Sequence, residues 1–296
     1  MAFDGYRSDP RPAKRPMVFG VLGRKTPAPV PPAITLLTDF GTDDIYAGVM
    51  KGVLRRIAPN STVIDLTHAV APQDVVQAAF LLQQAWRHFP VGTVHLVVVD
   101  PGVGTSRRRL ALRCEGHYFV GPDNGVLSAA LPDVARGQRG VGQAYEALEI
   151  NIPSEVQAFA GEGGVAEGVS ATFEGRDVFA PAAAFLANGG DISQIGRAIA
   201  RMQTLPAFRA PDLRGVVLHV DRYGNLITDI RGDDVPPGAA FDVAGRRLSL
   251  VRTYGDSSEL CAIVGSGGFV EVALPGGSAA ALLGVGKGAL VSGVTS

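Results

Sequence analysis

The chain has 296 residues, which is enough for one large domain or two domains of ordinary size. Hydrophobic residues make up 46% of it and charged residues 19%, with a formal net charge of -1, so we expect a substantial buried core. A net charge this close to zero does not indicate a nucleic-acid or membrane-surface partner. No apolar run reaches the roughly 18–20 residues that span a bilayer. Cys114 and Cys261 fit no metal-ligand spacing and are typical of a reducing compartment, so a cytoplasmic location is expected.

The first 32 residues are rich in proline and basic residues and lack the apolar segment of a signal peptide, which predicts a disordered tail or an over-long start. Beyond them, strand and helix patterns alternate. Continuous apolar runs predict strands, and apolar residues at a helical spacing predict the helices between them. The β-α-β-α-β order indicates a largely parallel sheet with helices on both faces. The expected elements are strands at 33–37, 62–66 and 94–99 and helices at 45–57 and 74–89.

Polar side chains stand where each of these strands ends. Asp39 follows the first strand, His68 the second and Asp100 the third, whereas Asp123 and Asn124 follow a fourth strand. The carboxyl ends of parallel strands are where open α/β sheets hold ligands, so we expect one polar rim. Asp100 opens the turn DPGVG, and Arg107 lies seven residues later, close enough to fold back and pair with it.

The second half of the chain changes in texture. A Gly-rich stretch at 137–169 predicts loops and short strands, and helices are expected at 177–187 and 192–202. Short β runs separated by turns then predict a small antiparallel barrel or sandwich. The fold class is therefore α/β, with a smaller β-barrel domain after it. The expected boundaries are a tail at 1–32, an N-terminal α/β domain at 33–204, a linker at 205–215 and a C-terminal β-barrel domain at 216–296.

Several of these side chains have a structural explanation beside the functional one. Asp39 either holds a ribose diol or caps a helix, and capping is the preferred explanation for Asp43 and Asp44. Glu174, together with Arg176 and Asp177, either caps the alanine-rich helix or contributes to a site. The DRYGN segment is explained by hairpin geometry from its residue pattern alone. The histidines form no metal-binding pattern, so no catalytic metal is predicted.

Taken in order, seven segments resemble the S-adenosylmethionine hydroxide adenosyltransferases, relatives of the fluorinase and chlorinase enzymes. They cover almost everything from Ile34 to Gly286, and the ordered set is far more specific than any one segment. The segments are TDFGTDDIYAGVMKG, DLTH, VVVDPGVGTSRR, GPDNG, TFEGRDVFAPAAA, VDRYGNLITDI and SGGFVEVAL.

The resemblance implies hydrolysis of S-adenosyl-L-methionine to adenosine and L-methionine, without metal or cofactor. It also implies a homotrimer whose substrate lies between the N-terminal domain of one subunit and the C-terminal domain of another. By motif, Asp39 would bind the ribose hydroxyls and Asp221 the methionine ammonium. The other implied substrate contacts are Asn225 to the adenine, Tyr254 stacked on the purine, and the Ser266 turn near the amino-acid end.

The family activates water with an Asp-Arg-His triad, and Asp100 and Arg107 match its first two members. Glu174 stands at the third position, where a histidine is expected. We hypothesise that Asp100 and Glu174 form a coupled pair sharing one water, with Arg107 fixing Asp100. A carboxylate at position 100 favours water over a halide. The Glu174 change leaves open a catalytically weak protein that binds the same ligand, and a metal-dependent phosphoesterase is a third alternative.

Overall fold

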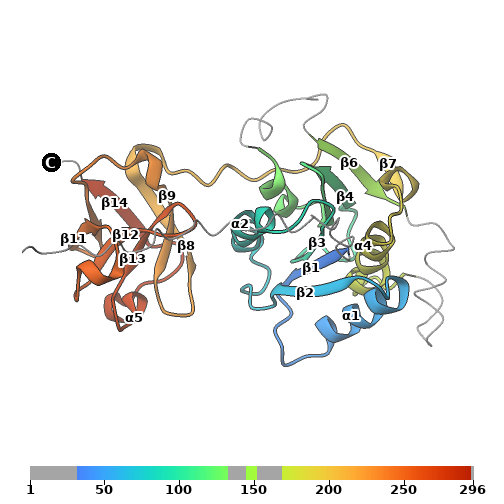
Figure 1. The fold of residues 1–296 in the computed structure, drawn as a ribbon, viewed down its shortest axis with the longest axis horizontal. Coiled ribbons are helices and arrows are strands. Elements are labelled where there is room, and N and C mark those ends of the chain that lie inside the picture. The colour runs from blue at the N-terminus through green and yellow to red at the C-terminus, as the bar shows by residue number, and fades with distance from the viewer. Residues whose placement is uncertain (1–31, 133–144, 152–168, 295–296) are drawn as a thin grey trace, which may run out of the picture. The chain divides into compact units, whose positions relative to one another are not determined.

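The computed structural model describes residues 32–132, 145–151 and 169–294, and it confirms the predicted fold class (Figure 1). A sheet with helices on both faces is followed along the chain by a closed barrel. The predicted tail, apart from its last residue, and most of the Gly-rich stretch lie outside the described residues.

Within the described residues, the first sheet has seven strands in the order β2-β1-β3-β5-β4-β6-β7. The pairs β2-β1, β1-β3 and β3-β5 are parallel, and the remaining three pairs are antiparallel. The strand β3 is buried along its whole length, as its continuous apolar sequence predicts. The strands are β1 (Ala33–Thr38), β2 (Thr62–Thr67), β3 (Val94–Val98), β4 (Arg109–Cys114), β5 (His117–Pro122), β6 (Tyr145–Ile150) and β7 (Gly196–Ala198).

Two hydrophobic cores lie on the two faces of this sheet. Helices α1 (Tyr46–Ile57) and α4 (Ala180–Ala187) pack against each other and share one core with β1 and β3. Helix α2 (Val75–Ala85) and the short helix η2 (Val126–Ala130) share the other core. The sheet is therefore held between helical layers, and its strand ends remain available for polar groups.

The local sequence explains where the helices begin and end. Asp74 caps α2 by accepting a hydrogen bond from the backbone N–H of Gln77 at 2.9 Å. Helix α1 begins instead after Ile45, and no side chain caps it, so the capping role expected for Asp43 and Asp44 is wrong. The helix expected at 177–187 is α4 preceded by a π-helical turn, η4 (Gly175–Phe179).

The helix expected at 192–202 is not formed. Ile192, Ile195 and Ile199 mimic a helical spacing, but the segment contains a short 3-10 helix, η5 (Ile192–Gln194), and then the strand β7. The strand pairs with β6 at the edge of the sheet. A Cβ atom at Gly196 would lie 2.3 Å from the backbone oxygen of Glu149, so glycine permits this close approach. Pairing with the sheet overrides the helical pattern.

The barrel closes in the order β10-β11-β12-β13-β9-β8-β14, and its pairs are antiparallel except for β11 with β12. Alternating side chains of β9 are buried, which is the pattern of a strand with one face on a core. The barrel elements are β8 (Arg214–Val220), β9 (Leu226–Arg231), β10 (Ala240–Val243), β11 (Arg246–Val251), β12 (Cys261–Val264), β13 (Phe269–Ala273), α5 (Ala279–Leu283) and β14 (Leu290–Val294).

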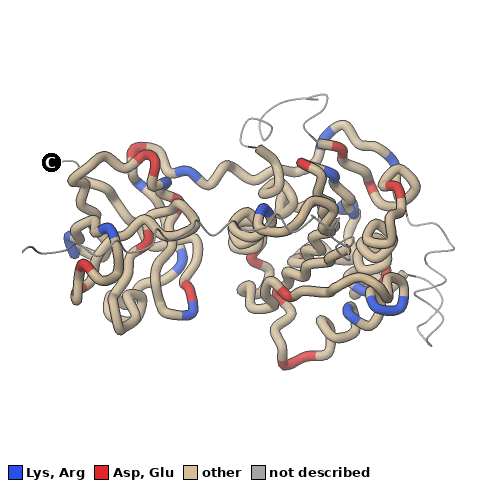
Figure 2. Tube along the Cα trace, in the orientation of Figure 1, with Lys and Arg blue, Asp and Glu red and all other residues tan. Residues whose placement is uncertain are grey.

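Acidic and basic residues are interspersed through the described parts of both the α/β region and the barrel (Figure 2). Of the helices that the structure describes, none has the length and apolar character needed to cross a membrane. Cys114 and Cys261 are both buried, and neither forms a disulfide bond.

Candidate active site

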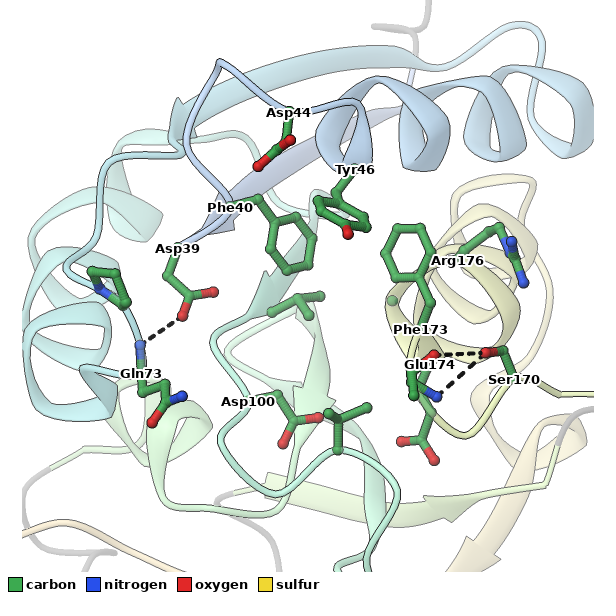
Figure 3. Close-up of a pocket in the computed structure, with 15 residues that line it drawn as sticks. Asp39, Phe40, Asp44, Tyr46, Gln73, Asp100, Ser170, Phe173, Glu174 and Arg176 are labelled. Carbon is green, nitrogen blue, oxygen red and sulfur yellow. Dashed lines mark hydrogen bonds between the residues drawn. The ribbon is translucent and has the colours of Figure 1, made fainter.

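The parallel half of the first sheet places polar residues at one edge. Asp39 follows β1, and Asp100 lies just beyond β3, its direct parallel neighbour. Both line a cavity of about 590 Å³, together with Glu174 from the segment that leads into η4 (Figure 3). The expectation that strand ends would bring these side chains together agrees with the geometry.

Asp100 is fixed by the turn that follows it. Its Oδ1 accepts a hydrogen bond from the backbone N–H of Gly102 at 3.2 Å and another from Nε of Arg107 at 2.8 Å. Its Oδ2 is paired with Nη2 of the same guanidinium. The side chains of Asp100 and Arg107 are only 6% and 8% exposed, so this bidentate pair is a buried one and has a defined orientation.

Glu174 is also held by arginines. Its Oε2 pairs with Nη2 of Arg107, which therefore contacts both carboxylates. Its Oε1 accepts a hydrogen bond from Nε of Arg109 at 2.9 Å and pairs with Nη2 of Arg109 as well. The alternative that Glu174 caps a helix is wrong, because it makes no side-chain cap hydrogen bond.

Arg109 was not among the residues singled out from the sequence, although a signal for it was present. In extended chain, alternate residues point to the same side. Arg107 and Arg109 both reach Glu174, whereas Arg108 between them pairs with Asp123. The run of three arginines therefore divides between two sites.

The far wall of the cavity is aromatic. The rings of Phe40, Tyr46 and Phe173 meet edge-on or tilted, with centroids 5.2 to 6.0 Å apart. In Figure 3 they lie above the carboxylates of Asp100 and Glu174. Asp39 lies beside them and accepts a hydrogen bond from the backbone N–H of Gln73 at 2.7 Å. One Asp39 oxygen and an apolar wall are thus presented to the same space as Asp100 and Glu174.

The other rim residues have structural partners. His68 is buried, its Nδ1 lies 2.8 Å from the Thr38 hydroxyl, and its Nε2 lies 3.1 Å from Asp65. Asp123 is engaged by Arg108 and by the backbone N–H of Gln203 at 2.7 Å. Asn124 donates to the backbone oxygen of Val99 at 2.9 Å, which ties the GPDNG turn to the chain just before Asp100.

A second cavity, of about 850 Å³, opens on the barrel and is lined by Asp221, Asn225, Tyr254 and Ser266. Asp221 follows β8, and its Oδ1 accepts hydrogen bonds from the backbone N–H groups of Tyr223 and Asn225 at 2.9 and 2.8 Å. Its Oδ2 accepts from Nδ2 of Asn225 at 2.9 Å. These bonds form the expected hairpin turn, and the same two side chains face the cavity.

Glu271 also lines the barrel cavity, and sequence reasoning missed it because it lies within a strand pattern. Its Oε2 accepts a hydrogen bond from the Tyr254 hydroxyl at 3.2 Å. Burial raises the pKa of Glu271 from its ordinary value, and the charge of Asp221 adds to this, while the Tyr254 hydrogen bond opposes it. Burial, followed by the charge of Glu271, raises the pKa of Tyr254 to about 12.

The predicted site residues therefore form two groups. Asp39, Asp100 and Glu174, with Arg107 behind them, belong to the first cavity, and the barrel residues belong to the second; the described lining of one cavity includes no residue of the other. Among the residues that the structure describes, no group of three or more His, Cys, Asp or Glu side chains is placed to hold a metal ion.

Comparison with known proteins agrees with this division into two regions. Residues 34–196 match the model of the SAM hydroxide adenosyltransferase N-terminal domain, and residues 215–292 match that of the C-terminal domain. The chain is 42% identical over 260 residues to the (R)-S-adenosyl-L-methionine hydrolase of Thermus thermophilus, covering 86% of this chain and 96% of the relative.

A fluorinase from an Actinoplanes species is 27% identical, covering 79% of this chain and 87% of the relative. The crystal structure of an uncharacterized conserved protein from Thermotoga maritima superposes with a TM-score of 0.75 at 35% identity, covering 88% of this chain and 100% of that one. Both domain models match in the expected order and span most of the sequence. The chain therefore belongs to the SAM hydroxide adenosyltransferase family.

Proposed function

We propose that this protein hydrolyses S-adenosyl-L-methionine to adenosine and L-methionine. The observation that carries the proposal is the buried pairing of Asp100 and Glu174 with Arg107 in the cavity that also holds Asp39. Relatives named (R)-S-adenosyl-L-methionine hydrolase, at up to 42% identity over most of the chain, support it.

In the proposed reaction, the oxygen of a water molecule attacks the ribose C5′ in line with the bond to sulfur. The C5′–S bond breaks with its electron pair going to sulfur, which leaves as the neutral thioether of methionine. The water proton passes to a carboxylate and then to solvent. Because the leaving group departs neutral, neither a general acid nor a cofactor is required. The protein must instead position the water and accept its proton.

Asp100 is the proposed proton acceptor, since it faces the cavity and its orientation is fixed by Arg107 and Gly102. We assign the ribose hydroxyls to Asp39, which lines the same cavity as Asp100. Phe40, Tyr46 and Phe173 line the same cavity with apolar rings, which we propose keep bulk water away from the reacting carbon.

We further propose that substrate lies between the α/β cavity of one copy and the barrel cavity of a second copy, in a homotrimer. Each cavity supplies what the other lacks, since the barrel offers Asp221 for the ammonium, Asn225 for the adenine, Tyr254 for stacking and Ser266 near the amino-acid end. Two buried cysteines that form no disulfide suit a reducing compartment, so we place the protein in the cytoplasm.

Turnover of S-adenosyl-L-methionine in water enriched in oxygen-18 tests the reaction. Adenosine and methionine are the expected products, with the heavy oxygen in the 5′-hydroxyl of adenosine. Tight calorimetric binding with no adenosine after hours would replace hydrolysis with a binding function. Label absent from the 5′-hydroxyl would overturn attack at C5′.

A complementation experiment tests the shared site. Asp100→Asn and Asp221→Asn damage different cavities, so trimers reassembled from an equal mixture regain wild-type pairs at about a quarter of their sites. Recovered activity well above either variant alone is expected. Mixed trimers no more active than the parents would place the whole site within one copy.

A further inference from the structure

Glu174 is a buried carboxylate that needs more positive charge than Arg107 alone can give it. Its side chain is 2% exposed, and a buried carboxylate is costly unless it is paired and hydrogen-bonded. Arg107 cannot serve it exclusively, because Nε and Nη2 of Arg107 also hold both oxygens of Asp100. The Oε1 atom of Glu174 is left to Arg109, which contacts it through two nitrogens.

The formal charges of this cluster show what Arg109 adds. Asp100, Glu174 and Arg107 together carry one net negative charge, and Arg109 brings the sum to zero. The cavity is lined by both carboxylates and, among the described residues, by neither guanidinium. The positive charges therefore lie behind the carboxylates, where they neutralise them without occupying the space for substrate.

We propose that Arg109 is a positioning residue for the reaction. It neutralises Glu174 so that Arg107 stays on Asp100, and the cluster of Asp100, Glu174 and the two arginines meets the substrate sulfonium with no net charge. This inference rests on the proposed function. The sulfonium loses its charge as the C5′–S bond breaks, so excess negative charge in the cavity stabilises bound substrate more than the transition state. A neutral cluster avoids that loss of rate.

The chain offers a matched control on the same strand. Arg109 is the first residue of β4, and Arg113 is four residues later on the same face of that strand. Arg113 pairs with Glu146 at 2.8 Å, away from the cavity, and its side chain is 52% exposed. Arg113→Gln therefore removes an arginine and an ion pair from the same strand without touching the cluster.

The test compares steady-state kinetics of Arg109→Gln, Arg109→Lys and Arg113→Gln with wild type. We expect Arg109→Gln to lower kcat roughly tenfold or more while also lowering KM, since ground-state binding of the cation improves. Arg109→Lys restores the charge but not the two-nitrogen contact, so it should recover part of kcat and all of the KM shift. Arg113→Gln should match wild type.

A double variant separates charge from folding. Arg109→Gln with Glu174→Gln returns the cluster to zero net charge, so its KM should return to the wild-type value even if kcat stays low. Circular dichroism and thermal melting identify any variant that fails to fold. A KM that is unchanged or higher in a folded Arg109→Gln protein, or kinetics equal to those of Arg113→Gln, would overturn the proposal.

Failure of the proposed function would look different. A wild-type protein that forms no adenosine refutes hydrolysis. An active wild type together with an Arg109→Gln variant of unchanged kcat and KM refutes only the role of Arg109. Calorimetric titration with S-adenosyl-L-methionine gives a reading that needs no turnover. Arg109→Gln should bind the cation more tightly than wild type, and equal or weaker binding counts against the charge argument.

Discussion

The two cavities hold their carboxylates in opposite ways. In the α/β region, Asp100 and Glu174 are bound by two guanidinium groups and their charge is cancelled. In the barrel, Asp221 is held by backbone N–H groups and an amide, and Glu271 by a tyrosine hydroxyl. Neutral donors orient a carboxylate without cancelling its charge. For the proposed reaction, the first arrangement suits water activation next to a sulfonium, and the second leaves the charge of Asp221 for the ammonium group that we assign to it.

Asp100→Asn is expected to produce the largest effect, because it removes the proposed proton acceptor while leaving the barrel cavity intact. The kcat should fall by about 10³-fold, the usual contribution of a general base, with a much smaller change in KM. Steady-state assays of adenosine release measure both. A higher KM with an unchanged kcat would assign Asp100 to substrate binding, and the two cavities would then no longer differ in role.

Asp221→Asn should show the reverse division. Removing the charge that we propose binds the methionine ammonium costs a charge-assisted hydrogen bond, so KM should rise about 10- to 100-fold and kcat should change less. Methionine amide, whose ammonium is intact, should inhibit wild type and lose its inhibition in the variant. A variant with normal KM would remove Asp221 from the substrate site.

Acid stability should distinguish the two regions through their buried groups. Burial lowers the pKa of His95 to about 3, with a smaller contribution from His117. As the pH falls below the unfolded-state value, the unfolded chain takes up a proton that folded His95 refuses, so the free energy of unfolding decreases. At pH 5 this costs about 2 kcal/mol relative to pH 8. Urea unfolding of His95→Phe should show a smaller acid loss by about that amount.

Glu271 should act in the opposite direction. Its raised pKa lets the folded state keep a proton that the unfolded state releases, so its contribution is present at low pH and is lost as the pH rises through the folded pKa. Glu271→Gln removes this offset, and the acid loss of stability should become larger than in wild type. If both variants shift the acid loss in the same sense, the assigned pKa directions are wrong.

Tyr254→Phe is expected to have the smallest effect. It keeps the ring for stacking and removes the 3.2 Å hydrogen bond to Glu271. A typical hydrogen bond within a protein contributes about 1 kcal/mol, so KM should change by no more than about fivefold. Tyr254→Ala, which removes the ring as well, should raise KM further. Equal effects of the two substitutions would mean that the hydroxyl, and not the ring, carries the contribution.

Sequence reasoning located the rim because the relevant signals are local. An apolar run that ends on Asp39 or Asp100 reports a strand end directly, and parallel strands align their ends. The pairing of Asp100 with Arg107 was also within reach, since one turn separates them. The role of Arg109 was not, because Glu174 lies 65 residues away in sequence and only the folded sheet brings the two together.

The errors have a similar cause. The spacing of Ile192, Ile195 and Ile199 fits a helix. The segment instead forms the strand β7, because it pairs with the edge of β6. Glu271 has the appearance of one polar residue in a strand, and its place in the barrel cavity depends on closure of the barrel. In each case the deciding partner is distant along the chain.

The π-helical turn η4 determines the direction in which Glu174 points relative to helix α4. Its backbone bond from Ala180 to Gly175 spans five residues, one more than in an α-helix. Deleting one residue of Gly175–Phe179 would regularise the turn, and since each α-helical residue rotates the chain by about 100°, Glu174 would swing away from both arginines. Helix α4 and its alanine packing would stay in place. A single-residue insertion or deletion ahead of Val178 and Phe179, the two core residues of the turn, would thus change how Glu174 meets its arginines.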